Sequence, residues 1–298
     1  MSALLPLRPA FLARLDSARE LGWRFFRGAH AIGAPGTPPE EFEGHRPYFP
    51  GDDVRWIDWN LFARQEELSV KVFRADEEVE VLFLVDASPS MTGGLGVKYE
   101  RAAAAAAALA RLALLTGHPV RAARYADRLL DVGGPWRSPD DIAAVQRFLA
   151  GPPPAGVGTD LARALDPFIT GLQRPASIVA LSDGFQEAPL ATAAARALTR
   201  GARRVSLVRV IDAADLTPPL RGHSVLIDAE GPQRREIIAD RALEEAAHRQ
   251  IAHHFLLLGE ALARLGAPLH ELPVGRPFEE AFLALLRAVA PAPAPKTA

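Results

Sequence analysis

The sequence contains no cysteine, which excludes disulfide bonds, thiolate nucleophiles and zinc–thiolate sites. It also lacks an excess of one charge, because 34 lysines and arginines stand against 36 aspartates and glutamates, for a net charge of -2. A nearly neutral chain without a long basic stretch disfavours nucleic acid as the default partner. The sequence therefore points away from thiol chemistry and from nucleic-acid binding.

Long hydrophobic runs are missing as well. The most apolar stretches, residues 102–115 and 255–265, are interrupted by charged side chains. Neither approaches the ~18 uninterrupted apolar residues that a membrane span needs. The first residues also lack the basic-then-apolar pattern of a secretory signal. We therefore expect a cytoplasmic protein with no membrane span.

Two apolar runs, each ending near an aspartate, dominate the rest of the chain. Residues 81–85 read Val-Leu-Phe-Leu-Val and precede Asp86, and residues 178–181 precede Ser182 and Asp183. Continuous apolar runs of this length are typical of strands buried on both faces of a parallel sheet. From residue 79 onward, expected strands alternate with expected helices. The sequence thus predicts an α/β fold with a doubly wound, mainly parallel, Rossmann-type sheet.

The first 78 residues do not follow this alternation. Residues 8–27 have the spacing of an amphipathic helix, and residues 68–73 alternate as a two-faced strand does. We expect residues 1–78 to form an N-terminal helix and a small β addition packed on the main domain. The main domain should span residues 79–290, and the proline- and alanine-rich residues 291–298 should be a disordered tail.

Five oxygen donors follow the predicted strands or begin a predicted helix. They are Asp86, Ser88, Ser90, Thr159 and Asp183. Open α/β sheets place ligand sites at the carboxyl ends of their strands, and Mg²⁺ prefers about six oxygen ligands. Taken singly, each residue has an ordinary explanation; a loop threonine before a helix, for example, is often its N-cap. Together they predict a site for Mg²⁺, or for Mn²⁺ or Ca²⁺, that keeps a position for a partner's acidic side chain.

This set resembles a known site. Asp86-x-Ser88-x-Ser90, with Thr159 and Asp183, looks like the metal-ion-dependent adhesion site of von Willebrand factor A domains. The segment Arg46-x-Tyr48-x-x-Gly51-Asp52-Asp53-x-Arg55-x-Ile57-Asp58-Trp59, followed by Ala63-Arg64, is similar to the signature of the family catalogued as domain of unknown function 58, DUF58. The resemblance implies a von Willebrand factor A-like fold. It also implies association with a MoxR-type AAA+ ATPase in the assembly or activation of other protein complexes.

The signature segment also supplies a candidate partner-binding patch. Its members are Arg46, Arg55, Trp56, Asp58, Trp59 and Arg64. Aromatic and arginine side chains are frequent at binding hot spots. The alternative, which we favour, is structural: Asp58 pairs with an arginine, and the tryptophans pack a small lobe onto the sheet.

Two functions from different classes remain. The first is a Mg²⁺-dependent protein-interaction module, a chaperone adaptor without catalytic residues, which binds a MoxR-type ATPase and a client protein through an acidic side chain of the client. The second is a metal-dependent phosphoryl-transfer enzyme that uses Asp86. A dehalogenase-like phosphatase would want a second acid at position 88, which is serine, and the chain has neither a Gly-x-Ser-x-Gly elbow nor a Walker loop. We therefore expect a binding protein rather than an enzyme.

Overall fold

The structure is a computed structural model. It describes residues 7–27, 41–47, 57–65, 68–74, 79–92, 97–151, 158–170, 176–185, 187–200, 202–218 and 222–289. The chain divides into two compact units, one formed by residues 1–29 and 79–298 and the other by residues 30–78.

A six-stranded sheet forms the centre of the larger unit. Its strands, in spatial order, are β10 (Leu269–Pro273), β7 (Ala202–Ile211), β6 (Ala176–Ser182), β3 (Glu80–Asp86), β4 (Val120–Tyr125) and β5 (Leu129–Trp136). The pairs from β10 to β4 are parallel, and β5 lies antiparallel to β4. The prediction of an α/β fold with a mainly parallel sheet is confirmed.

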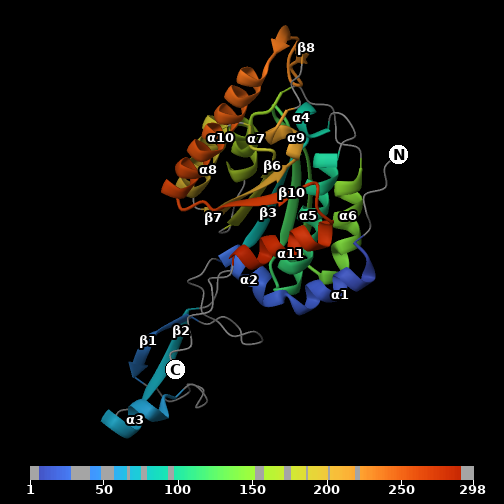
Figure 1. The fold of residues 1–298 in the computed structure, drawn as a ribbon. Helices are drawn as coiled ribbons and strands as arrows, with labels where there is room; N and C mark the ends of the chain where they lie inside the picture. Colours follow the sequence, from blue (N-terminus) through green and yellow to red (C-terminus); the bar gives the residue numbers. More distant parts are fainter. Residues whose placement is uncertain are drawn as a thin grey trace, which may run out of the picture. The chain divides into compact units, whose positions relative to one another are not determined.

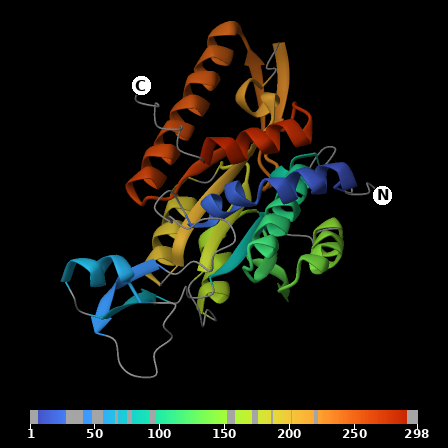
Figure 2. The same ribbon diagram turned by 90° about the horizontal axis from the view of Figure 1, so that it is seen from below.

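Helices cover both faces of this sheet (Figures 1 and 2). One face carries α1 (Pro9–Ser17), α2 (Arg19–Arg27), α5 (Val97–Leu115), α6 (Ile142–Ala150) and α11 (Phe278–Val289). The other face carries α7 (Leu161–Thr170), α8 (Glu187–Thr199) and α10 (Arg241–Arg264). Each helix layer encloses its own hydrophobic core against the sheet, which is the arrangement expected of a doubly wound fold.

The central strand β3 contributes to both cores. Val81, Phe83 and Val85 belong to the core under α5, whereas Leu82 and Leu84 belong to the core under α7 and α10. Side chains alternate between the two faces along a strand, so a strand covered on both sides must be apolar at every position. This explains why the run before Asp86 is uninterrupted.

The alanine run of α5 packs directly on the sheet. All seven alanines at positions 102–108 are buried, with relative exposures of 4% or less. Alanine favours the helix and its small side chain lets the helix axis approach neighbouring elements closely. The run is therefore a packing surface.

The predicted N-terminal helix is divided in two. Instead of one helix over residues 8–27, the structure has α1 and α2, separated at Ala18, whose N–H donates to the carbonyl of Leu15. Phe11 and Leu15 are buried, and Phe11 makes edge-on contacts with Phe278 and Phe282 of α11. The break turns the chain so that both short helices can pack on the same core.

These helices belong with the sheet. The predicted division after residue 78 placed them with the signature segment, whereas residues 1–29 form one compact unit with residues 79–298. The physical reason is the apolar contact just described, which ties α1 to α11. The tail predicted over residues 291–298 lies outside the described residues.

Several short elements complete the chain. The larger unit contains α4 (Pro89–Thr92), a 3₁₀ turn (Pro139–Asp141), α9 (Ala213–Leu216) and a separate antiparallel hairpin of β8 (Gly222–Ile227) and β9 (Arg234–Ala239). The smaller unit contains β1 (Glu41–Pro47), α3 (Trp59–Gln65) and β2 (Ser69–Arg74), with β1 and β2 antiparallel. Among the described helices, none combines the length and the apolar character that crossing a membrane would require.

Candidate metal centre

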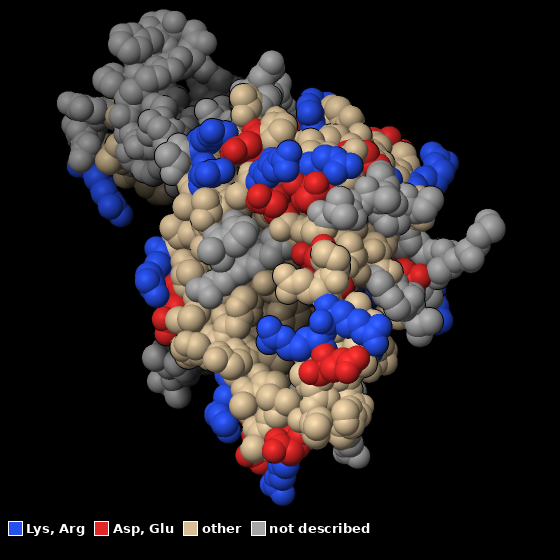
Figure 3. Space-filling view, turned by 90° about the horizontal axis from the view of Figure 1, so that it is seen from above, with Lys and Arg blue, Asp and Glu red and all other residues tan. Residues whose placement is uncertain are grey.

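The candidate site lies at the carboxyl edge of the sheet, where the direction of chain progression reverses. From β3 the chain passes to β4 on one side, and the later parallel strand β6 pairs with β3 on its other side. Loops that leave neighbouring parallel strands in opposite directions open a crevice at that edge, where ligands bind in open α/β sheets. Figure 3 looks onto this end, over which basic and acidic side chains are interspersed.

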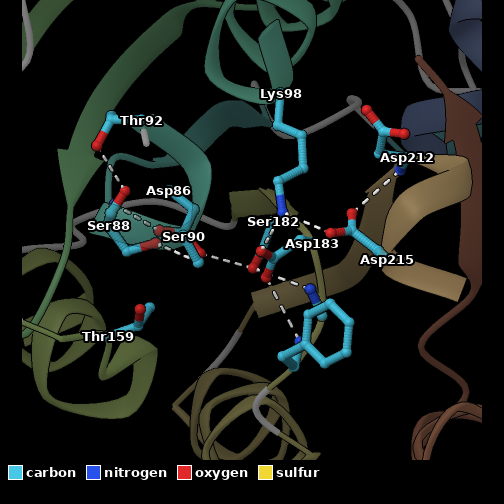
Figure 4. A network of polar contacts seen from close by, with 12 residues as sticks. Asp86, Ser88, Ser90, Thr92, Lys98, Thr159, Ser182, Asp183, Asp212 and Asp215 are labelled. Atoms are coloured by element: carbon cyan, nitrogen blue, oxygen red, sulfur yellow. Dashed lines mark hydrogen bonds and ion pairs between the residues drawn. The ribbon is translucent and has the colours of Figure 1, made fainter. Parts of the chain in front are cut away.

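The loop after β3 is organised around the carboxylate of Asp86. Its Oδ1 accepts a hydrogen bond of 2.9 Å from the backbone N–H of Ser88, and the Ser88 and Ser90 hydroxyl oxygens lie 3.0 Å apart. The Thr92 hydroxyl donates to the Ser88 carbonyl across α4 at 2.8 Å. Asp86 thus caps a tight turn that brings two serine hydroxyls beside its own carboxylate (Figure 4).

The neighbouring strand contributes a residue that the sequence reasoning did not select. The hydroxyl of Ser182, the last residue of β6, donates to Oδ2 of Asp86 at 2.6 Å. It also accepts from the backbone N–H of Gly184 at 3.2 Å. The signal in the sequence is its position directly before Asp183 at the end of an apolar run.

Burial dominates the electrostatics of Asp86. The residue is 1% exposed, and this desolvation is the main reason that its pKa is raised to about 7. The nearby charge of Asp183 also raises the pKa, whereas the hydrogen bonds from Ser182 and Ser88 lower it. The pKa of the buried neighbour Tyr125 is raised as well, by burial and then by Asp86. In the described part of the chain, the hydrogen-bond donors to Asp86 are neutral. A bound cation would therefore supply the positive charge that is needed to balance the ionised carboxylate.

Asp183 is held differently, by a lysine. Nζ of Lys98, in the first turn of α5, lies 3.0 Å from Oδ2 of Asp183 and 3.2 Å from Oδ1 of Asp215 in α9. Burial lowers the pKa of Lys98, but the two carboxylates more than offset this, and the net direction is upward. Lys98 and Asp215 are separated from Asp183 by more than thirty residues on either side, so no local sequence signal joins them.

Thr159 lies on a third loop. The backbone N–H of the next residue, Asp160, donates to the carbonyl of Ala126 at 2.8 Å, just beyond the end of β4. Asp160 Oδ1 accepts from the backbone N–H of Arg163, so Asp160 rather than Thr159 takes the capping role at the start of α7. The Thr159 hydroxyl donates to Glu230, in the turn between β8 and β9.

The structure therefore brings together part of the predicted set. Asp86, Ser88 and Ser90 are in direct contact, and Asp183 follows Ser182, which bonds Asp86. No contact joins Thr159 to the other residues drawn in Figure 4. Among the described residues no group of three or more histidines, cysteines, aspartates or glutamates could hold a metal ion. The predicted set would not form such a group, because three of its five donors are hydroxyls.

The signature segment falls mainly in the smaller unit. Arg46 lies in β1 opposite Val70, and Arg64 lies in the last turn of α3. Arg55 and Trp56 lie outside the described residues. Asp58 begins α3, because its Oδ1 accepts from the backbone N–H groups of Asn60 and Leu61.

Trp59 is the first residue of α3. It is 59% exposed and packs edge-on against Phe62, itself 36% exposed. The packing of the tryptophans onto the sheet stays a prediction.

Comparison with known proteins fixes the family. A family model described as "Protein of unknown function DUF58" matches residues 44–255, a range that includes the whole signature segment and both aspartates of the site. The chain belongs to the DUF58 family. A member from Mycobacterium tuberculosis (strain ATCC 25618 / H37Rv), "Uncharacterized protein Rv1480", is 34% identical over 253 residues, which cover 82% of this chain and 77% of that protein.

Two solved structures are similar to this DUF58 protein. They are the conserved hypothetical protein BatB from Bacteroides thetaiotaomicron, with 17% identity and a TM-score of 0.42, and an aerotolerance-related membrane protein from Bacteroides fragilis NCTC 9343, with 18% identity and a TM-score of 0.41. Each match covers 71% of this chain and 98% of the other.

These names correct the expected location. The assignment of this chain to the cytoplasm is withdrawn; the similar protein from Bacteroides fragilis is itself named a membrane protein. That assignment depended on the lack of a signal pattern and of a long apolar run. Neither absence decides where a protein lies, because a protein can be held at a membrane by an interfacial helix or a lipid anchor.

Proposed function

We propose that this DUF58 protein is a divalent-metal-dependent protein-interaction module with a von Willebrand factor A-like site. The ligands proposed for Mg²⁺, or for Mn²⁺ or Ca²⁺, are Asp86, Ser88, Ser90, Thr159 and Asp183. The observation that carries this proposal is the buried carboxylate of Asp86, which has two serine hydroxyls beside it and only neutral donors among its described contacts.

The donor chemistry fits a hard cation. Carboxylate and hydroxyl oxygens are the ligands that Mg²⁺ and Ca²⁺ prefer, and Ser182 holds Asp86 in place from the outside. A bound ion would supply a positive charge at the carboxyl edge of the sheet that attracts an acidic side chain of a partner. Asp86 would anchor the ion, and Ser88 and Ser90 would complete its surroundings without cancelling its charge.

The partners proposed here follow from family resemblance and from this charge. The resemblance of the signature segment favours a MoxR-type AAA+ ATPase as one partner, with the module acting as an adaptor in assembly or activation of protein complexes. The other partner would be a client protein that presents an aspartate or glutamate. Among the described side chains that Figure 3 shows at this end, basic and acidic groups are interspersed, which favours contact with a single acidic side chain over nucleic-acid binding.

Phosphoryl transfer by Asp86 is the alternative, and its geometry is unfavourable. A dehalogenase-like phosphatase would place a second acid two residues after its nucleophile, and that position is Ser88, whose backbone N–H donates to Asp86. A phosphatase assay with and without Mg²⁺ decides between the two. Metal-dependent turnover that disappears in Asp86→Asn would support the enzyme and contradict the adaptor.

Metal titration of the full chain tests the proposed site. Calorimetry with Mn²⁺ and Mg²⁺ should give one saturable site in the wild type, strongly weakened in Asp86→Asn and in Ser88→Ala. Asp166→Asn is the matched control, because Asp166 of α7 pairs with Arg196 of α8 and with Arg200 just after that helix, away from the loop after β3. Equal metal binding by wild type and Asp86→Asn would overturn the proposal.

A further inference from the structure

Lys98 is the one basic side chain that the described structure places directly on a proposed metal ligand. Its Nζ bridges Oδ2 of Asp183 and Oδ1 of Asp215 at 3.0 and 3.2 Å, and the exposed fractions of the three side chains are 15%, 5% and 20%. Figure 4 shows the lysine reaching down from α5 between the loop after β6 and the helix α9. A cation held this closely must affect any second cation that Asp183 binds.

We propose that Lys98 sets the charge of the metal site: by neutralising Asp183 it weakens the hold on the metal ion and strengthens the attraction of the bound ion for a partner's carboxylate. This inference rests on the proposed function and adds the residue that tunes it. Lys98 is a positioning residue, since it acts through Asp183.

The charge balance gives the reason. The two negative charges of Asp86 and Asp183 would cancel the charge of a divalent ion. Little net positive charge would then remain to attract the carboxylate of a partner. Lys98 returns one positive charge to this group at hydrogen-bond distance. Charges that are largely removed from water interact strongly over such distances, so the effect should be visible in both equilibria.

Lys98 contacts one carboxylate oxygen of Asp183 and one of Asp215. Oδ2 of Asp215 accepts from the backbone N–H of Asp212, which fixes the carboxylate at the start of α9. On Asp183, Lys98 occupies Oδ2, whereas among the described residues the contact of Oδ1 is a long one of 3.5 Å from the backbone N–H of Phe185. Asp183 can thus keep its lysine on one oxygen and offer the other to a metal ion.

The experiment measures two affinities in the same variants of the full chain. Calorimetry gives the affinity for Mn²⁺, and acetate binding to the Mn²⁺-loaded protein is followed by the loss of water-proton relaxation enhancement as acetate displaces metal-bound water. For Lys98→Met we expect Mn²⁺ to bind about tenfold tighter and acetate about tenfold weaker. Lys98→Arg keeps the charge and should stay close to the wild type in both.

Two further variants keep the test sharp. Asp215→Asn retains Lys98 but removes the second carboxylate that Lys98 contacts. Each affinity should therefore shift in the direction opposite to that in Lys98→Met, with weaker Mn²⁺ binding and tighter acetate binding. Arg121→Met removes the same charge from the amino-terminal part of the sheet, where Arg121 pairs with Glu80, and should change neither. Opposite shifts in Lys98→Met and Asp215→Asn support the inference.

The contrary outcomes separate the two proposals. If the wild type binds Mn²⁺ but Lys98→Met lowers both affinities together or changes neither, Lys98 is a structural ion pair and this inference is wrong, while the metal site stands. If the wild type binds no Mn²⁺, the proposed function fails and the inference fails with it.

Discussion

The hydroxyl of Ser182 donates a hydrogen bond of 2.6 Å to Oδ2 of Asp86 and so joins the ends of two neighbouring strands, β6 and β3. Ser182 and Asp86 are 2% and 1% exposed, so neither can exchange this bond for water without local opening. A buried acceptor that loses its donor costs about 1–3 kcal/mol. The pair therefore matters both to the stability of the sheet edge and to the charge state of Asp86.

We predict that Ser182→Ala destabilises the protein by about 1–2 kcal/mol and weakens metal binding. The hydrogen bond from Ser182 lowers the pKa of Asp86, so its removal raises that pKa further and favours the protonated acid, which is a poor metal ligand. Denaturant unfolding measures the first effect, and Mn²⁺ calorimetry at constant pH measures the second.

Ser177→Ala is the matched control for this prediction. Ser177 stands at the other end of the same strand, is 2% exposed, and donates to the carbonyl of Phe26 at 2.7 Å. Its loss should cost a similar free energy of unfolding and leave Mn²⁺ binding unchanged. Equal weakening of metal binding by both variants would show that the effect comes from general loosening of β6.

The sequence alone predicted the site residues that follow the ends of strands. It did not predict the residues whose side chains connect one strand or loop to another. Asp86 and Asp183 follow uninterrupted apolar runs, and such runs predict buried parallel strands with a polar carboxyl end. Lys98, Ser182 and Asp215 act through contacts over long sequence separations, which depend on strand order. Amphipathic spacing over residues 8–27 likewise predicts helix but does not reveal the break at Ala18, after which both short helices pack on the same core.

Arg124 allows a prediction about the opposite face of the same sheet edge. Its side chain is 8% exposed, pairs with Asp131 of the neighbouring strand, donates to the carbonyl of Gly151 at 2.7 Å and lies over the ring of Phe148 at 5.0 Å. Removing one partner of a largely buried ion pair leaves the other without compensation. We predict that Arg124→Met lowers the free energy of unfolding by about 3 kcal/mol, measured in urea.

The control for Arg124→Met is Arg128→Met. Arg128 pairs with Asp127 next to it, but its side chain is 52% exposed, and exposed ion pairs contribute about 0–1 kcal/mol. Equal losses in the two variants would contradict the distinction drawn here between buried and exposed pairs.

The alanine run of α5 gives a prediction about packing. Ala105 is 0% exposed in the core between α5 and the sheet, so Ala105→Leu must displace the helix or its neighbours. Overpacking of this kind costs about 1–3 kcal/mol, or more where the backbone cannot move. Ala252→Leu, on an exposed position of α10, is the control and should change the melting temperature little. An Ala105→Leu variant with the melting temperature of the wild type would contradict tight packing of α5 on the sheet.

His270 gives a prediction about pH. Burial, reinforced by the charge of Arg204, lowers the pKa of His270 from 6.5 to about 4, and its ring lies 5.2 Å from that of Phe25. Between these two values the unfolded chain binds a proton that the folded chain does not, so the free energy of unfolding should fall as the pH falls from 6.5 to 4. The full contribution is at most about 3 kcal/mol, at 1.36 kcal/mol for each unit of pKa difference.

Replacing His270 by phenylalanine removes this dependence while keeping a ring against Phe25. We predict that the difference in unfolding free energy between His270→Phe and the wild type grows in favour of the variant as the pH is lowered from 6.5 to 4, and is constant above pH 7. Asp86, whose raised pKa of about 7 gives stability the opposite trend with pH, is present in both proteins, so its contribution cancels in the difference. Urea unfolding at matched ionic strength across this range measures it. A difference independent of pH would mean that His270 is protonated equally in the folded and unfolded chains, and that its burial beside Phe25 and Arg204 does not exclude the proton.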